Sequence, residues 1–341
     1  MTDKLRVAIL GCGGIARHHA LTYHAHPNAE LVALCDVSEE RVAAFVDRIE
    51  EKAPGIAKDA GRFTDAGKMY GEAAPEAVSI CTPHTLHYRQ CLEALDAGCH
   101  VLVEKPMVTS CADAVALEKR VQAGDRQLQI AYITPSRAEC GRLREICRTE
   151  EYGALKVVNC TIGQHWYQGT RGAWRQDPAL SGGGMIYDSG AHVLNTLVWT
   201  VEQDIEEVHA YVDNRDTQVD INGTVNIRFR NGVIASVAVC GEAPASSSGA
   251  WYFEQATVQL DPWIGTGLAI RARRNGETKD DDPRVTAEDS NPMHNFIEAI
   301  LGRAEPVTTP RNGVILSRLM DAIYESARTG APARPTSSGR Q

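Results

Sequence analysis

The side chains best suited to acid–base chemistry are a lysine in the first half of the chain and an aspartate–histidine pair in the second. Lys105 lies in the tripeptide Glu104-Lys105-Pro106, directly after the apolar run 99–103. That run predicts a buried strand, so the lysine is expected at the carboxyl end of a parallel sheet, where cofactor and substrate meet in open α/β folds. Taken alone, the tripeptide would better fit a surface lysine held by a turn proline.

The aspartate–histidine pair, Asp188 and His192, follows the glycine run 182–184. Residues four apart on a helix share a face, so the two side chains are expected side by side. A carboxylate beside a histidine keeps the imidazole basic and oriented, as a general base requires. The alternative is an ion pair on a helix surface. The glycines permit close backbone approach and an unusual turn, and they favour the catalytic interpretation.

A glycine-rich turn near the N-terminus predicts a dinucleotide site. It has the form G-x-G-x-x-A and consists of Gly11, Cys12, Gly13, Gly14, Ile15 and Ala16. The first glycine permits the tight turn, the second lets a pyrophosphate approach the backbone, and the small third residue lets helix and strand pack closely. The following helix start supplies N–H groups and a partial positive charge for the phosphates.

Asp36, 25 residues after Gly11, ends the next predicted strand and bears on which dinucleotide is bound. Its carboxylate can accept hydrogen bonds from the adenosine ribose and would repel a 2′-phosphate. Arg41, one helical turn further on, is the first cation after Asp36 and could partly rescue NADP binding. NAD is therefore the preferred cofactor.

A loop containing Thr82, Pro83 and His84 follows the fourth predicted strand, and His87 lies one turn into the next helix. We expect this loop and the tripeptide 104–106 to line the nicotinamide half of the cofactor. The alternative is a plain β–α turn with proline at a helix start. The spacing of the two histidines could suit a metal pair, but no carboxylate or cysteine pattern accompanies it, so no metal is predicted.

The elements that must position these residues alternate in the first half of the chain. Apolar runs predict strands over 5–10, 30–35, 77–81, 100–103 and 128–132, with helices between them. Ser38 is a good N-cap for the helix after the second strand. Strands that alternate with helices predict an α/β fold with a doubly wound parallel sheet.

The second half has a different pattern. Strand-like runs cover 211–212, 223–230, 233–239 and 251–260, and helices are predicted over 292–301 and 314–328. Asn231-Gly232 between two of the runs is a strong hairpin signal. We expect a Rossmann domain over 1–132, an α+β domain with a large, mostly antiparallel open sheet over 133–328, and a flexible tail over 329–341.

Composition limits the class of protein. Hydrophobic residues make up 43% of the chain and charged residues 23%, as in soluble globular proteins. The net charge of −9 argues against a nucleic-acid partner, and the apolar runs are too short for a membrane span. Ten cysteines without paired spacing, and an N-terminus without a secretory signal, suggest the cytoplasm.

On these residues the chain resembles the glucose-fructose oxidoreductase / inositol dehydrogenase / rhizopine-catabolism family (Gfo/Idh/MocA). The matching segments are 11–16, 82–87, 97–106, 182–192 and 295–300, which occur in the family's order over nearly the whole chain. The resemblance implies an NAD(P)-dependent oxidoreductase of a sugar, anhydrosugar or cyclitol. It also implies an open sheet that often carries an oligomer interface, so a homodimer or homotetramer is expected.

Alcohol oxidation gives the three reactive side chains distinct roles. We expect His192 to remove the hydroxyl proton, Lys105 to donate a hydrogen bond to the developing oxyanion or share the proton relay, and Asp188 to bind a neighbouring hydroxyl and tune His192.

The expected substrate pocket also contains Tyr132, Trp174 and Arg175, with Trp166 nearby, because aromatic faces suit sugar rings. For Trp166, packing under a sheet is an equal alternative, and Arg175 could equally pair with Asp177.

Two other functions are compatible with the same fold. One is an enzyme that recycles NAD while cleaving a glycosidic bond, and the other is a non-catalytic NAD-binding sensor. The presence of Lys105, Asp188 and His192 speaks against a sensor, which has no need of the three.

Overall fold

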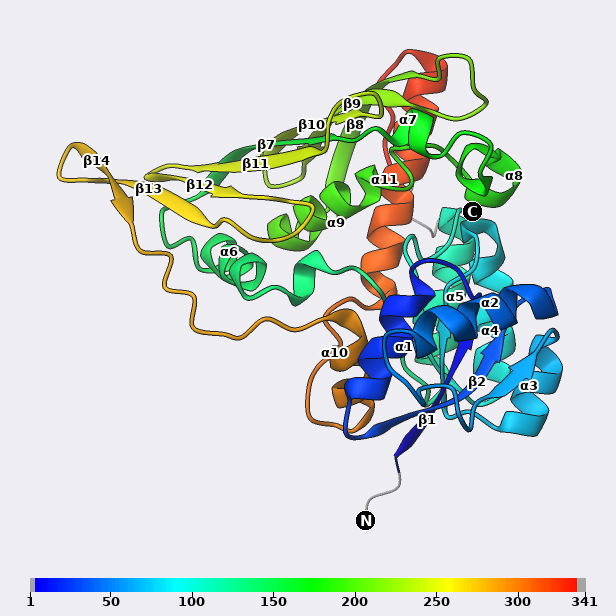
Figure 1. Ribbon diagram of the computed structural model, residues 1–341. Coiled ribbons are helices and arrows are strands. Elements are labelled where there is room, and N and C mark those ends of the chain that lie inside the picture. The colour runs from blue at the N-terminus through cyan, green and yellow to red at the C-terminus, as the bar shows by residue number, and fades with distance from the viewer. Residues whose placement is uncertain (1–3, 336–341) are drawn as a thin grey trace. The chain divides into compact units, whose positions relative to one another are not determined.

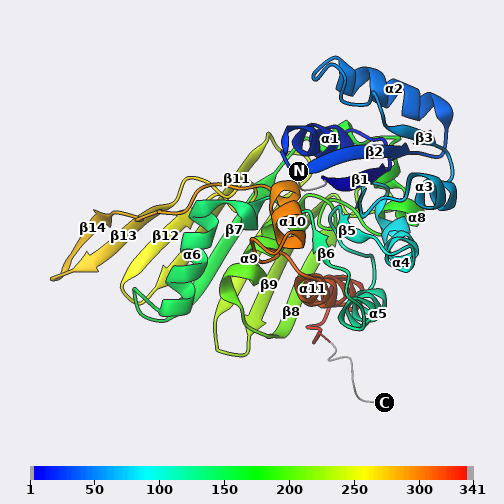
Figure 2. The same cartoon turned by 90° about the horizontal axis from the view of Figure 1, so that it is seen from below.

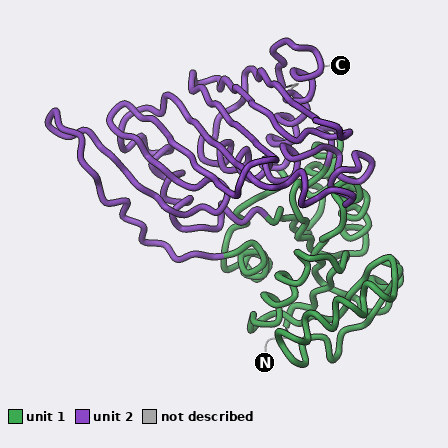
Figure 3. Tube along the Cα trace, turned by 45° about the horizontal axis from the view of Figure 1, so that its top comes forward, with its two compact units in different colours: residues 1–108, 113–131, 291–310 green, residues 109–112, 132–290, 311–341 purple. Residues whose placement is uncertain are grey.

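The protein, seen in a computed structural model, is described over residues 4–335 and divides into two compact units (Figure 3). The described residues of unit 1 fall in Met1–Val108, Asp113–Ala131 and Asn291–Pro310. Those of unit 2 fall in Thr109–Ala112, Tyr132–Ser290 and Arg311–Gln341. Each unit contains its own sheet, and we describe the units separately.

Unit 1 contains the predicted doubly wound sheet. Its six strands lie in the order β3-β2-β1-β4-β5-β6, and all neighbours are parallel. The strands are β1 (Leu5–Leu10), β2 (Ala29–Cys35), β3 (Gly61–Phe63), β4 (Ala77–Ile80), β5 (His100–Val103) and β6 (Leu128–Ile130). The strand order reverses between β1 and β4, which is where open α/β sheets bind ligands at their carboxyl ends.

Helices follow the strands of unit 1 in the expected alternation. They are α1 (Ala16–Ala25), α2 (Glu39–Glu50), α3 (Ala66–Ala73), α4 (His87–Asp96) and α5 (Cys111–Gln122). The Ser38 side chain caps α2 by accepting the Arg41 N–H at 3.2 Å, which confirms the predicted cap. The helix expected from residue 84 is divided into a 3-10 turn, η1 (His84–Leu86), and α4.

The late helix α10 (Pro292–Ile300) belongs to unit 1, although a boundary at residue 132 places it in the second domain. Its Met293, Phe296 and Ile297 are buried in one cluster with Val7 and Leu102 of the parallel sheet. The helix is amphipathic, and this apolar face needs a partner. A linear boundary cannot show that the partner is made of strands that lie about 190 to 290 residues earlier in the chain.

Unit 2 contains an eight-stranded sheet in the order β14-β13-β12-β11-β7-β10-β9-β8. Neighbours are antiparallel except β7 and β10, which are parallel, so the sheet is mostly antiparallel as expected. The strands are β7 (Leu155–Gly163), β8 (Ile205–Asp213), β9 (Asn222–Phe229), β10 (Ile234–Cys240), β11 (Ser246–Phe253), β12 (Ala256–Leu260), β13 (Ala269–Arg274) and β14 (Glu277–Asp281).

The hairpin prediction and one of the strand predictions for this sheet had different outcomes. Asn231-Gly232 joins antiparallel β9 and β10, and Gly232 has the positive φ of 89° that favours glycine there. The single strand expected over 251–260 is wrong, because β11 and β12 are separate antiparallel strands. The N–H groups of Glu254 and Gln255 between them bond to carbonyls of 152–154. Neither residue is a glycine or proline, so the turn left no signal in the sequence.

Helices α6 (Ala138–Thr149), α9 (Gly190–Val201) and α11 (Pro310–Thr329) lie along one face of the sheet (Figures 1 and 2). The shorter helical segments of unit 2 are η2 (Thr134–Ser136), α7 (Trp166–Gly169), η3 (Trp174–Gln176) and α8 (Pro178–Ser181). The strand registers place Tyr211, Ile234 and Tyr252 on one common face, where all three are exposed. We call this the outer face.

The tail expected over 329–341 is partly ordered. Ala333 pairs with Val208 of β8 through two backbone hydrogen bonds of 2.8 Å, and its side chain is buried. This backbone pairing fixes the described part of the segment around Ala333. Residues 336–341 lie outside the described residues.

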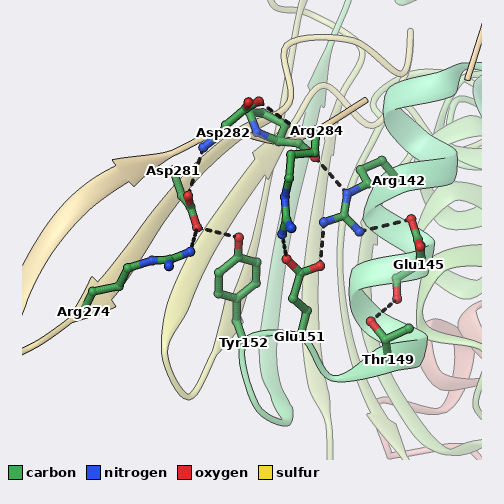
Figure 4. A network of polar contacts seen from close by, with 10 residues as sticks. Arg142, Glu145, Thr149, Glu151, Tyr152, Arg274, Asp281, Asp282 and Arg284 are labelled. Atoms are coloured by element: carbon green, nitrogen blue, oxygen red, sulfur yellow. Dashed lines mark hydrogen bonds and ion pairs between the residues drawn. The ribbon is translucent and has the colours of Figure 1, made fainter. Parts of the chain in front are cut away.

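A charged network fixes the segment after β14 in unit 2 (Figure 4). Arg142 of α6 donates to Glu151 and, at 2.8 Å, to the carbonyl oxygen of Pro283. Arg284 also bonds Glu151, and Asp281 accepts the Tyr152 hydroxyl at 2.8 Å. These bonds tie the chain leaving the sheet edge to α6, because several charges sharing partners hold a geometry that one exposed pair does not.

Candidate active site

The glycine-rich turn of unit 1 has the shape that a pyrophosphate requires. Gly11 has φ of 96°, and a Cβ there would lie 2.8 Å from the backbone of Cys81, so this position demands glycine. At Gly13 and Gly14 a Cβ would meet no heavy atom within 4 Å. That space lies at the start of α1, whose N–H groups suit phosphate. Ala16 is fully buried, as close packing of helix and strand requires.

Asp36 lies at the end of β2 and holds this turn in place. Its Oδ2 accepts the Cys12 N–H at 2.7 Å, and its Oδ1 accepts the Val37 N–H at 2.8 Å. A carboxylate has about four acceptor positions, so ribose hydroxyls can still donate to it. Arg48 of α2 donates to the Cys12 carbonyl oxygen at 3.0 Å. The sequence did not indicate Arg48, because it lies more than two helical turns beyond Ser38.

The histidine-containing loop is packed against the end of β5. His87 is fully buried, and its Nδ1 and Nε2 lie 2.8 Å and 3.0 Å from the carbonyl oxygens of Pro106 and Thr82. The His84 and His87 rings are 5.9 Å apart. Because a backbone carbonyl faces each of its nitrogens, the His87 ring links the loop after β4 to the turn after β5.

Glu104 and Lys105 follow β5 directly. The Glu104 N–H bonds the Ile80 carbonyl oxygen at 2.9 Å, which continues the ladder one residue past β5, and the Lys105–Pro106 peptide bond is cis. Glu104 Oε2 accepts the Lys105 N–H at 3.2 Å, and Oε1 lies 3.0 Å from Nε2 of His19. Burial alone would raise the pKa of Glu104, but the hydrogen bond from His19 and the charge of Lys105 hold that pKa below its usual value.

In unit 2, Asp188 precedes the helix that carries His192. Helix α9 begins at Gly190, so the expectation that the two residues share a helix face is wrong. Asp188 lies instead in the turn 185–189 that leads into α9, and the Gly190 N–H reaches back to the Met185 carbonyl oxygen. Asp188 Oδ2 accepts the Trp166 indole N–H at 2.9 Å and the Arg175 Nε–H at 3.0 Å.

These contacts bear on two alternatives that the sequence left open. Arg175 pairs with Asp188, whereas the Asp177 side chain caps α8. Trp166 is buried, as the packing alternative expects, and its ring nitrogen bonds the carboxylate of Asp188. The Arg175 guanidinium also lies 4.7 Å from the centre of the Trp174 ring.

Hydrogen bonds to the Asp220 carboxylate fix the turn that carries Asp188. The Asp220 carboxylate accepts the N–H groups of Gly184 and Ile186 at 2.8 and 2.7 Å, and the Tyr324 hydroxyl. A Cβ on Gly184 would lie 1.9 Å from the Asp220 carbonyl oxygen, so the glycine is sterically required. Burial raises the pKa of Asp220, against the lowering effect of these donors.

His192 lies in the first turn of α9, half-buried beside Tyr132. The two rings are 5.8 Å apart and perpendicular, and Tyr132 itself is buried. Unit 2 therefore brings Tyr132 and His192 together, and separately Trp166, Arg175 and Asp188. Lys105 belongs to unit 1.

These features define a dinucleotide-binding protein of two units. Unit 1 has a doubly wound sheet with a glycine turn and an acidic residue after β2, and unit 2 is an α/β unit that carries titratable side chains. The chain belongs to the GFO/IDH/MocA oxidoreductase family. Residues 5–132 match its oxidoreductase family model, an NAD-binding Rossmann fold, and residues 141–258 match the GFO/IDH/MocA C-terminal domain.

Several characterised proteins are similar over nearly their full length. D-glucoside 3-dehydrogenase of Escherichia coli (strain K12) is 25% identical, with 96% of this chain and 97% of that protein covered. Inositol 2-dehydrogenase of Rubrobacter xylanophilus is 25% identical, with 98% and 94% covered. The WlbA dehydrogenase structure from Bordetella pertussis, in complex with NADH and UDP-GlcNAcA, has a TM-score of 0.81 at 25% identity, with 98% and 100% covered.

Within the described part of the chain, no helix combines the length and the apolar character needed to cross a membrane.

Proposed function

We propose that this protein is an NAD-dependent dehydrogenase that transfers a hydride between nicotinamide and a secondary hydroxyl of a sugar, anhydrosugar or cyclitol. The observation that carries the proposal is the open space over Gly13 and Gly14 at the start of α1, with Asp36 fixed beside it. Two relatives that act on ring hydroxyls by name, the glucoside and inositol dehydrogenases, support the substrate class.

The chain's own residues supply the proton chemistry in this proposal. The nicotinamide, when bound, accepts the hydride. His192 takes the hydroxyl proton, Lys105 donates a hydrogen bond where negative charge develops, and Asp188 accepts a hydrogen bond from a neighbouring hydroxyl. Because Trp166 and Arg175 both donate to Oδ2 of Asp188, the carboxylate keeps one orientation towards the substrate.

Asp36 favours NAD over NADP in this proposal. Its carboxylate lies beside the turn where the adenosine ribose is expected, and it would repel a 2′-phosphate. Arg48, which approaches the same turn, lies against the Cys12 carbonyl oxygen. We therefore expect NAD to support faster turnover at equal concentration, although Arg48 supplies a nearby cation.

The first test is a screen of purified protein with NAD or NADP against sugars, anhydrosugars and inositols, following NADH absorbance. Turnover of one polyol with NAD supports the proposal. If the protein binds NADH but no polyol is oxidised, the proposal fails and an enzyme that recycles NAD while cleaving glycosides, or a sensor, takes its place. Release of the alcohol from an aryl glycoside without net NADH would identify the former.

Two substitutions test the residue roles once a substrate is found. Lys105→Ala and His192→Ala are each expected to lower kcat by roughly 10²–10⁴, because each removes a group that handles the proton or the developing charge. Thermal unfolding serves as the control for folding, because Lys105 is itself expected to line the nicotinamide. Near wild-type turnover in both variants contradicts the assignment.

We also propose that the protein is a cytoplasmic homodimer or homotetramer. All ten cysteines are unpaired thiols, as a reducing compartment favours. The outer face of the unit 2 sheet exposes Tyr211, Ile234 and Tyr252, and aromatic and large apolar side chains together are typical of interfaces.

A further inference from the structure

A chain of hydrogen bonds runs through the core of unit 1 from α1 to the turn that carries Lys105. The Tyr23 hydroxyl lies 2.6 Å from Ser79 Oγ, Ser79 Oγ lies 3.0 Å from His19 Nδ1, and His19 Nε2 lies 3.0 Å from Glu104 Oε1. Tyr23, Ser79 and His19 are all essentially inaccessible to solvent. The other oxygen of Glu104 accepts the backbone N–H of Lys105.

The donors and acceptors available to each side chain decide the direction in which these hydrogen bonds are donated. Glu104, when ionised, can only accept, so His19 Nε2 must carry a proton and donate to it. In the neutral ring Nδ1 then accepts from the Ser79 hydroxyl, and Ser79 Oγ accepts from Tyr23. Every group in the chain is then satisfied, and each proton points towards Glu104.

Stability alone is a weak reason for this arrangement. Buried polar and ionic groups are often replaceable by apolar side chains of similar volume without loss of stability. The chain of hydrogen bonds fixes the Glu104 carboxylate at the end of β5, and the carboxylate in turn fixes the backbone of Lys105. Its donor residue His19 lies on α1, the same helix whose first turn borders the open space at Gly13 and Gly14.

The other side of Lys105 is fixed independently. Pro106 is buried, and its carbonyl oxygen lies 2.8 Å from Nδ1 of buried His87. The residues immediately before and after Lys105 are thus each held by a buried histidine, one on α1 and one on α4. A lysine side chain has four rotatable bonds, and fixing both neighbouring residues fixes the point from which it extends.

We propose that His19 is a positioning residue for Lys105, acting through Glu104, so that the helix bordering the cofactor space and the reactive lysine are held as one unit. This inference rests on the proposed function, since it assigns Lys105 the role given above. His19 itself touches neither substrate nor reacting atoms in this scheme. Its loss therefore affects the rate of the chemical step more than cofactor binding, because misplacing a reacting group by about 1 Å costs on the order of 10²-fold.

The test compares three single variants of the full-length protein. His19→Leu removes the donor to Glu104, His19→Gln keeps an N–H that can reach it, and His24→Leu changes an exposed histidine on the same helix. For His19→Leu we expect kcat to fall roughly 10- to 100-fold while KM for NAD and the Kd of NADH change less than about threefold. His19→Gln should recover much of kcat, and His24→Leu should match the wild type.

A second readout does not depend on turnover. Hydrogen exchange of the peptide containing the Lys105 amide, measured in the NADH-bound protein, should be faster in His19→Leu than in the wild type or His24→Leu. If the wild type oxidises no substrate, the proposed function fails, and this exchange rate still decides whether His19 holds the turn.

Three results overturn the inference. One is unchanged kcat in His19→Leu, and another is unchanged exchange at the Lys105 amide. The third is a loss of kcat that is matched by an equal loss of NADH affinity and is not recovered in His19→Gln, since that pattern marks a role in folding alone.

Discussion

At the scale of single residues, His87 shows how burial and hydrogen bonding compete. Its two ring nitrogens face two backbone carbonyls, but a neutral imidazole has one N–H to donate. Protonation would satisfy both carbonyls at the cost of a buried charge. Burial is the larger effect and lowers the pKa of His87 below 6.5, while the carbonyls of Pro106 and Thr82 oppose it.

This shift predicts a pH dependence of stability. Since the pKa of His87 is lower in the folded protein, the unfolded chain binds its proton first, and stability present above pH 6.5 is lost as pH falls towards the folded value. We expect the wild type to lose more free energy of unfolding between about pH 7.5 and about pH 5.5 than His87→Gln does. The lowered pKa values of His26 and His100 are common to both proteins and cancel.

Urea unfolding at the two pH values measures the difference. His24→Gln, an exposed substitution, is the matched control and should keep the wild-type dependence. Parallel pH profiles for the wild type and His87→Gln would count against a neutral, buried His87.

At the scale of elements, the two turns that carry site residues each require a glycine, but for opposite reasons. In the turn before α9, protein atoms fill the space beside Gly184, whereas at the start of α1 the space beside Gly13 is open. The first glycine is required by the fold. The second is required, in our proposal, by the cofactor.

Gly184→Ala is expected to destabilise the protein. Its Cβ would lie 1.9 Å from the Asp220 carbonyl oxygen, and the backbone on both sides is fixed by the Asp220 carboxylate. Overpacking of this kind costs about 1–3 kcal/mol or more. Thermal unfolding of Gly184→Ala beside Gly71→Ala, an unobstructed site in α3, measures the effect, and equal midpoints would show that the turn can move.

Gly13→Ala is expected to leave stability nearly unchanged and to weaken NADH binding. No heavy atom lies within 4 Å of the added methyl group, so folding is not obstructed. The methyl group would occupy the space that we assign to the pyrophosphate, and roughly a tenfold or greater loss of affinity is expected, about 1.4 kcal/mol or more. Fluorescence titration with NADH measures it. Wild-type affinity would mean that the phosphates bind elsewhere.

Some of the helices and strands could be predicted from the sequence and others could not. The buried strands of unit 1 were predicted because each is a short apolar run between turn residues. Strands β3, β7, β13 and β14 were missed. Strand β3 has only three residues, β14 has no apolar residue, and in β13 only Ile270 and Ala272 are buried, between exposed arginines. Asp188 and His192 were selected by type and flanking glycines, but the sequence did not predict that Asp188 lies in a turn before the helix. Ser79 and His19 had no signal, because their partners are 60 and 85 residues away.

At the scale of the whole molecule, we expect self-association through the outer face of the unit 2 sheet. Ile234→Asp places a charge in the middle of that face and should shift the protein towards monomers. Ile264→Asp is the matched control, because Ile264 is 48% exposed against 47% for Ile234 and lies in the turn after β12. Light scattering at micromolar concentration measures both, and an oligomer unaffected by Ile234→Asp, or a monomeric wild type, would exclude this interface.

The place of α10 in unit 1 has a consequence for how the protein is made. The cluster around Val7 and Leu102 is completed by Met293, Phe296 and Ile297, which leave the ribosome after residues 132–290 of unit 2. Until then the nascent first unit presents an uncovered apolar surface, the kind of surface that chaperones recognise and that promotes aggregation. Synthesis must therefore pass residue 300 before the first unit can close its core, although the strands of that unit are among the first residues to be made.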